Sequence, residues 1–269
     1  MAVGHYENFP VASLLLPAGL RAPVATIYRF ARSADDFADE GDRDDATRIA
    51  LLDGYRDRLD AIGRGETPDD PLFRDLARIV RAHGLDLQLF RDLLSAFTQD
   101  VTTRRYASFA ELLDYSRRSA NPVGRLLLRL FRADGTENLR RSDLICSGLQ
   151  LVNFWQDVAL DWAKGRVYLP QEDLARYGVA EAQIARGDAS GRWAELMAFE
   201  VDRTRDMMRE GAPLARAVGG RIGVELALVV EGGCRILEKI AAVRGDVFRH
   251  RPVLRAWDWP GLFVRALAA

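Results

Sequence analysis

Apolar residues recur every three or four positions along most of the chain, which is the spacing of helices with one buried face. No segment alternates apolar and polar residues for long enough to predict a strand. Stretches such as GRGETPDDP and KGRVYLP separate the periodic segments and indicate loops. None is long enough to link two domains, so we predict a single all-α domain over residues 1–269. The segments that we expect to be helical are 25–40, 47–62, 71–84, 87–101, 109–120, 123–132, 142–165, 193–211 and 224–243.

Composition and charge exclude some classes of function. The chain has 269 residues, of which 48% are hydrophobic, and a formal net charge of −1. This charge provides no basic field that would recruit nucleic acid, so we expect no nucleic-acid partner. Cys146 and Cys234 lie far apart and form no CxxC pair, which argues against a zinc site or a disulfide framework.

The ends of the sequence bear on localisation. The opening MAVGHYENFP lacks the charged and apolar regions of a signal peptide, and the longest apolar runs are too short to span a bilayer. We therefore expect a cytoplasmic protein. The C-terminal PGLFVRALAA is apolar but short, and we expect a helix docked on the protein. Peripheral contact with the inner membrane face is the alternative that the sequence leaves open.

Four acids fall within the eight residues SADDFADE, directly after an apolar helical segment. On a helix that turns about 100° per residue, Asp35 and Asp39 share one face, with Asp36 on its shoulder. Tyr28 and Arg32 precede them on the same side. Because like charges at this spacing repel each other, the cluster indicates either a solvated surface or a site for a cation.

A second polar stripe lies in QLVNFWQDVALD. Gln150, Asn153, Asp157 and Asp161 fall within about 80° on one helix face, and most of the other residues are apolar. Buried carboxylates without partners cost roughly several kcal/mol per ion. The stripe therefore predicts a polar cavity inside the fold, in which cations neutralise the acids.

The chemistry of the two stripes points to one class of ligand. Oxygen ligands without nearby His or Cys select Mg²⁺, Ca²⁺ or Mn²⁺. Mg²⁺ typically takes one or two carboxylates, several waters and the phosphate oxygens of a substrate. Two facing carboxylate helices therefore suit a Mg²⁺-bridged allylic or cyclopropylcarbinyl diphosphate. Metal ions stabilise the departing diphosphate, and an apolar, aromatic pocket shields the carbocation.

Three stretches together resemble the trans-head-to-head prenyl synthases, which are the squalene and phytoene synthases. They are YRFARSADDFADE, FTQDVTTRRYASFAELLDYSRRSANPVG and QLVNFWQDVALDWAKGRVYLP. Within this family the chain is most similar to the bacterial hydroxysqualene synthases, in its opening HYENFPVASLLLP and in SANPVGR. It departs from the family pattern NILRDVGED at NFWQDVALD, where Gln156 replaces an arginine and Leu160 replaces an acid. The resemblance implies a helical bundle around a central active-site cavity.

The resemblance also implies roles for individual residues. It implies a Mg²⁺ cluster that bridges the diphosphate, with ligands from both aspartate motifs. The implied metal ligands are Asp35, Asp39, Asn153, Asp157 and Asp161, and the implied catalytic acids are Asp35, Asp36, Asp39, Asp157 and Asp161. The implied substrate-binding residues are Tyr28, Arg32, Tyr115, Asn121, Gln150, Arg166 and Tyr168. Among these, Tyr115 and Asn121 would lie near the carbocation.

The implied reaction converts presqualene diphosphate and water into hydroxysqualene and diphosphate, within squalene and hopanoid biosynthesis. No NADPH is expected, and neighbouring enzymes of the pathway are expected partners. Two alternatives stay open. One is a sister enzyme that condenses two prenyl diphosphates into presqualene diphosphate, squalene or phytoene, and the other is a non-catalytic scaffold of the same fold. Phe154 and Trp155 are expected to be core residues.

Overall fold

The computed structural model describes residues 16–268, and every regular element within them is a helix. The one strand-like feature of this range is an isolated bridge between Arg105 and Val167. The prediction of an all-α fold is confirmed. The helices are α1 (Ala18–Asp39), α2 (Asp45–Gly63), α3 (Pro71–His83), α4 (Leu87–Thr102), α5 (Phe109–Ser119), α6 (Asn121–Leu130), α7 (Thr136–Gln156), α8 (Val158–Ala163), α9 (Gln171–Tyr177), α10 (Glu181–Arg186), α11 (Trp193–Gly211), α12 (Leu214–Val218), α13 (Gly220–Ala242), the short 3₁₀ helix η1 (Ala256–Asp258) and α14 (Trp259–Ala268).

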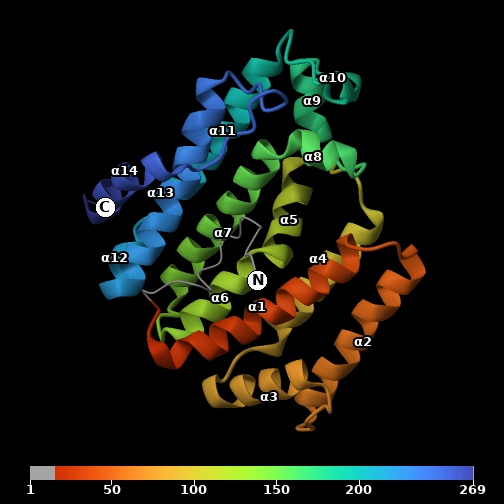
Figure 1. The fold of residues 1–269 in the computed structure, drawn as a ribbon, viewed down its shortest axis with the longest axis vertical. Coiled ribbons are helices and arrows are strands. Elements are labelled where there is room, and N and C mark those ends of the chain that lie inside the picture. The colour runs from red at the N-terminus through yellow and green to blue at the C-terminus, as the bar shows by residue number, and fades with distance from the viewer. Residues whose placement is uncertain (1–15, 269) are drawn as a thin grey trace.

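Helix α7 runs through the middle of the molecule, with α1 and α4 on one side and α11 and α13 on the other (Figure 1). Two large hydrophobic clusters hold this arrangement together. One joins α1 to α4 around the edge-on rings of Phe30, Phe73 and Phe90. The other surrounds Trp155 of α7 and Trp193 of α11, both fully buried. The cavity described below lies where α1 faces α7.

Local capping signals set the ends of the helices in the first half. Asp44 accepts a hydrogen bond from the backbone N–H of Thr47 at 2.8 Å and begins α2. Asp70 caps α3 in the same way, directly before Pro71 at the first helical position. Gly84 ends α3 with a φ of 61°, which glycine adopts without strain. The bounds of α2 and α3 therefore agree closely with the predicted segments.

The helix predicted over 142–165 is divided in two at Asp157. This residue has φ −108° and ψ 17°, well outside regular helical values, and it separates α7 from α8. Its N–H still donates to the carbonyl of Asn153 at 2.9 Å, so backbone hydrogen bonding continues across the kink. The prediction of one continuous helix is wrong at this point, and the kink separates Asp157 and Asp161 from the regular stripe on α7.

The C-terminal helix α14 packs on α13 and buries Leu262 and Ala266, as expected for a docked helix. Across residues 16–268, no helix combines the length and the apolar character that crossing a membrane requires. The opening HYENFPVASLLLP, which contributed to the subfamily prediction, lies almost entirely outside the described residues.

Candidate active site

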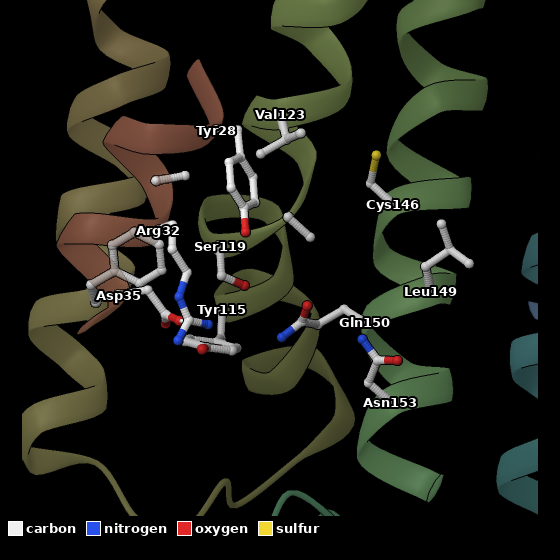
Figure 2. Close-up of a pocket in the computed structure, with 13 residues that line it drawn as sticks. Tyr28, Arg32, Asp35, Tyr115, Ser119, Val123, Cys146, Leu149, Gln150 and Asn153 are labelled. Carbon is white, nitrogen blue, oxygen red and sulfur yellow. Dashed lines mark ion pairs between the residues drawn. The ribbon is translucent and has the colours of Figure 1, made fainter. Parts of the chain in front are cut away.

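A cavity of about 350 Å³ lies between α1 and α7, and residues of α4, α5 and α6 complete its wall. Helix α1 contributes Tyr28, Arg32 and Asp35, and these side chains face Gln150 and Asn153 of α7 across the cavity (Figure 2). The two polar stripes therefore meet at one site, although more than a hundred residues separate them in the sequence.

Arg32 pairs with the acids of the first motif. Its guanidinium lies 2.7 Å from the carboxylate of Asp36 and 3.7 Å from that of Asp35. The pKa of Asp35 is raised to about 6, because burial and then the nearby Asp39 carboxylate disfavour its charged form. This end of α1 carries more negative charge than Arg32 alone balances.

Asp39 is held by the loop that follows α8. Arg166 donates to both carboxylate oxygens of Asp39, at 3.0 and 2.5 Å, and the ammonium of Lys164 lies 3.2 Å away. Burial opposes ionisation, but these two cations hold the pKa of Asp39 below its usual range. Arg166 is 7% exposed and also donates to the backbone carbonyl of Asp100 at 3.0 Å. The loop is thereby clamped to the end of α1.

The acids of the second motif lie at and beyond the kink. Asp157 accepts two hydrogen bonds from Arg251, at 2.6 and 3.1 Å. The pKa of Asp161 is raised to about 7, because burial and then the Asp157 carboxylate disfavour its charge, with a smaller contribution from Asp39. Carboxylates of the first and second motifs are thus close enough for the charge of one to disfavour ionisation of another. The partner of Asp157 lies 94 positions away, so the local pattern carries no sign of this contact.

Several of the predicted site residues do not line the cavity itself. Asn121 is buried and accepts a hydrogen bond from the hydroxyl of Ser147 at 2.9 Å. Tyr168 is also buried, with its ring stacked on Phe154 at 3.8 Å between centroids. The predicted residues outside the lining are Asp36, Asp39, Asn121, Asp157, Asp161, Arg166 and Tyr168.

The acids do not converge on a single point in this structure. Within residues 16–268, no three side chains from His, Cys, Asp and Glu form a group that could hold a metal ion. Guanidinium and ammonium groups of the chain lie against Asp36, Asp39 and Asp157 instead. The carboxylates are therefore partly neutralised by the protein's own cations.

Asp100 of α4 belongs to the site but was not among the predicted residues. It is 4% exposed, and its Oδ2 accepts a hydrogen bond at 2.7 Å from the hydroxyl of Tyr115, which lines the cavity. Its Oδ1 has no hydrogen-bond partner in the part of the chain that the structure describes. The pKa of Asp100 is raised to about 7, because burial outweighs the hydrogen bond from Tyr115. The available signal was a single acid near the end of the apolar stretch LLSAFTQDV.

Aromatic rings surround Tyr115 behind the cavity wall. Its ring lies 5.4 Å from that of Tyr106 and 6.2 Å from those of Phe154 and Tyr168, between centroids. Phe154 is buried, and Trp155 is fully buried with its indole N–H donating to Thr204, so both lie in the core as predicted. The electron-rich faces of this cluster can stabilise a positive charge nearby.

A smaller apolar chamber of about 80 Å³ adjoins the cavity. The two spaces share Val123, Cys146 and Leu149, and the chamber extends to Leu214 of α12 and Leu226 of α13. The site therefore has a charged end near the aspartate motifs and an apolar end toward the C-terminal helices.

The family model for squalene/phytoene synthase matches residues 2–258. A hydroxysqualene synthase from Zymomonas mobilis is 33% identical over 232 residues, which cover 84% of this chain and 76% of that protein. A 15-cis-phytoene synthase from Synechococcus elongatus is 30% identical over 272 residues, which cover 94% of this chain and 85% of that protein.

A solved structure shows the same arrangement of helices. The crystal structure of squalene synthase HpnC from Alicyclobacillus acidocaldarius superposes with a TM-score of 0.83 and 37% sequence identity. The match covers 89% of this chain and 90% of that one.

Proposed function

The chain belongs to the squalene/phytoene synthase family, and we propose that it is a hydroxysqualene synthase acting on presqualene diphosphate. The reaction breaks the bond between carbon and the diphosphate oxygen, rearranges the carbocation and adds water to give hydroxysqualene. Addition of water to the carbocation releases one proton. No hydride donor takes part, so the proposal includes no NADPH.

One observation carries this proposal: the cavity joins a cluster of acids and bases to an apolar, aromatic interior. Arg32 and Asp35 lie at the polar part of its wall, with Arg166 and Lys164 just beyond. The apolar chamber past Leu149 continues the cavity toward α12 and α13 and would receive one end of a hydrocarbon chain. This polarity matches a substrate with a diphosphate head and a long hydrocarbon body.

The oxygen atoms of the aspartate-motif side chains are of the type that Mg²⁺ prefers, and we propose that they bind it in exchange for the guanidinium and ammonium groups now paired with them. They offer carboxylate and amide oxygens. Burial and then neighbouring carboxylates raise the pKa values of Asp35 and Asp161, so a cation beside these acids would favour their charged forms. The proposed ligands are Asp35, Asp39, Asn153, Asp157 and Asp161. Bound Mg²⁺ would neutralise the charge that develops on the departing diphosphate. Arg32, Lys164 and Arg166 are the side chains that would hold diphosphate oxygens directly.

Polar groups on the cavity wall support capture of water. The hydroxyl of Ser119 has no hydrogen-bond partner within residues 16–268 and projects into the cavity (Figure 2). The Tyr115 hydroxyl donates a hydrogen bond to Asp100, so the phenol oxygen can accept a hydrogen bond from a water molecule. We propose that Ser119 and Tyr115 hold the attacking water. Its proton passes to Tyr115 while the phenol proton passes to Asp100.

The test is incubation of the purified protein with Mg²⁺ and presqualene diphosphate without NADPH, followed by mass spectrometry of the extract. We expect a C30 alcohol with the mass of hydroxysqualene. Omission of Mg²⁺ should abolish its formation. Unchanged presqualene diphosphate would contradict the proposal.

Condensation of two prenyl diphosphates is the second candidate function. Phytoene synthases match this chain at 30–31% identity, close to the identity of the hydroxysqualene synthases. Release of diphosphate from farnesyl or geranylgeranyl diphosphate alone would support this candidate. If none of these substrates reacted with Mg²⁺ present, the non-catalytic alternative would be favoured.

We also propose that the protein makes peripheral contact with a membrane through its C-terminal segment. Trp257, Trp259 and Phe263 are exposed there, together with Val264 and Leu267. Tryptophan and phenylalanine beside aliphatic residues are typical of surfaces that enter the interface of a bilayer. Such contact suits an enzyme whose proposed substrate and product are both lipids.

A further inference from the structure

The segment between α13 and η1 passes over the kink at Asp157. Arg251 of this segment donates from Nε to Oδ1 of Asp157 at 2.6 Å and from Nη2 to Oδ2 at 3.1 Å. This two-point geometry is the strong, oriented form of an arginine–carboxylate contact. It brings a guanidinium from the C-terminal part of the chain to the second aspartate motif.

The residue beside Asp157 holds the same segment. The side-chain amide of Gln156 donates to the backbone carbonyl of Pro252 at 2.5 Å, and Gln156 is 3% exposed. From α13, the ammonium of Lys239 donates to the carbonyl of Val253 at 2.8 Å. Two consecutive carbonyls are thus fixed from two helices. We call residues 251–253 the strap.

The tethers determine where Arg251 lies. Its backbone directly precedes the carbonyl held by Gln156, so the start of its side chain is fixed relative to α7. Its side chain is 38% exposed and that of Asp157 is 26% exposed. Because both side chains are partly exposed, solvent ions compete with their contact, so another anion can replace Asp157 as the partner of Arg251. The Arg251 guanidinium can therefore exchange Asp157 for another anion while the Arg251 backbone stays fixed in the strap.

We propose that Gln156 is a positioning residue that acts through Arg251. The buried amide fixes the strap, and the strap places the Arg251 guanidinium where it can pass from Asp157 to the diphosphate. Asp157 would release the guanidinium for this exchange on binding a divalent cation. This inference rests on the proposed function for its substrate, but its ligand is the diphosphate group alone.

The test measures binding of inorganic diphosphate with Mg²⁺ by calorimetry. Loss of a charge-assisted contact typically weakens binding about tenfold or more, so we expect that loss for Arg251→Ala. We expect a smaller loss for Gln156→Met, which keeps the length of the side chain and removes its amide. Arg251→Lys keeps the charge without the two-point geometry and should fall between wild type and Arg251→Ala. Arg249→Ala, an exposed change just outside the strap, should bind as wild type does.

The double variant decides whether Gln156 acts through Arg251. If it does, Gln156→Met adds no further loss in the Arg251→Ala background. Additive losses, wild-type affinity in Arg251→Ala, or failure of the wild-type protein to bind diphosphate would each overturn the inference. Should Gln156→Met melt far below the wild type, the two Arg251 variants still decide the role of the guanidinium. If diphosphate binding depends on Arg251 but presqualene diphosphate is not turned over, the proposed function is rejected. The inference that the strap positions Arg251 for diphosphate is then retained.

Discussion

Single side chains in this protein carry charge that their surroundings only partly balance. Asp39 has two cationic partners, Arg166 and Lys164, whereas the pKa values of Asp35 and Asp161 are raised by burial and by nearby carboxylates. A site of this kind gains most from a ligand that brings positive charge to the acids and negative charge to the bases. Removal of one acid should therefore affect turnover far more than folding.

We expect Asp39→Asn and Asp157→Asn each to reduce turnover of presqualene diphosphate at least about a hundredfold, because each removes a charge proposed to hold Mg²⁺. Circular dichroism should show unchanged helicity. Asp202→Asn alters an exposed acid on α11 and is the matched control, which should keep full activity. Full activity in both site variants would refute the assignment of these acids to the metal.

Because Asp100 is buried, we expect the free energy of unfolding to depend on pH. Burial raises its pKa from the ordinary aspartate value of 3.8 to about 7, so the folded protein binds this proton more tightly than the unfolded chain. Stability from this group is therefore highest at low pH and falls as the pH rises from about 4 to about 7. Asn cannot titrate, so Asp100→Asn should remove this part of the loss.

The measurement is urea unfolding of wild type and Asp100→Asn at about pH 5 and about pH 8. The wild type should lose more free energy of unfolding between the two conditions than the variant does. Equal losses would show that Asp100 stays ionised across this range. In activity assays, Asp100→Asn should also lower the yield of the alcohol, because the proposed proton acceptor is gone.

At the scale of elements, the short helix α12 is joined to α13 by a close contact. A Cβ at Gly223 would lie 2.4 Å from the carbonyl oxygen of Ala215, a backbone atom that cannot rotate away. Gly223→Ala should force these helices apart and lower the free energy of unfolding by about 1–3 kcal/mol. Gly19→Ala is the matched control in α1, since a Cβ there meets no atom within 4 Å. Gly19→Ala should leave the stability unchanged or raise it slightly. Thermal denaturation of the two variants, compared with the wild type, measures this difference.

The helices also show which parts of the fold and of the site can be predicted from the sequence. The long helices follow from their apolar spacing, because one face of each is buried against a neighbour. The kink at Asp157 does not follow, since the pattern runs on without interruption and the partner Arg251 comes from a distant segment. Asp100 was missed for a related reason: one acid on an apolar helix has no spacing to detect. Its role depends on Tyr115 of another helix.

At the scale of the whole molecule, the charged and apolar ends of the site point to different parts of the fold. The acids lie where α1 and α8 meet the loop that follows α8, and the apolar chamber extends toward α12 and α13. Helix α14 packs on α13 and carries the exposed side chains Phe263, Val264 and Leu267. The apolar end of the site and the apolar patch on the surface thus share one helix as their support. This arrangement suits exchange of a lipid between the cavity and a bilayer.

Sedimentation with lipid vesicles tests this arrangement. We expect the wild-type protein to bind vesicles that contain anionic lipid, and Trp257→Ser combined with Phe263→Ser to reduce the bound fraction severalfold, because both side chains would leave the bilayer interface. Leu160→Ser is the matched control, since Leu160 is 52% exposed on α8, outside this patch. It should bind vesicles as the wild type does. Equal binding by all three proteins, or none by the wild type, would show that the C-terminal surface is not a membrane contact. In that case the lipid substrate must reach the cavity by another route.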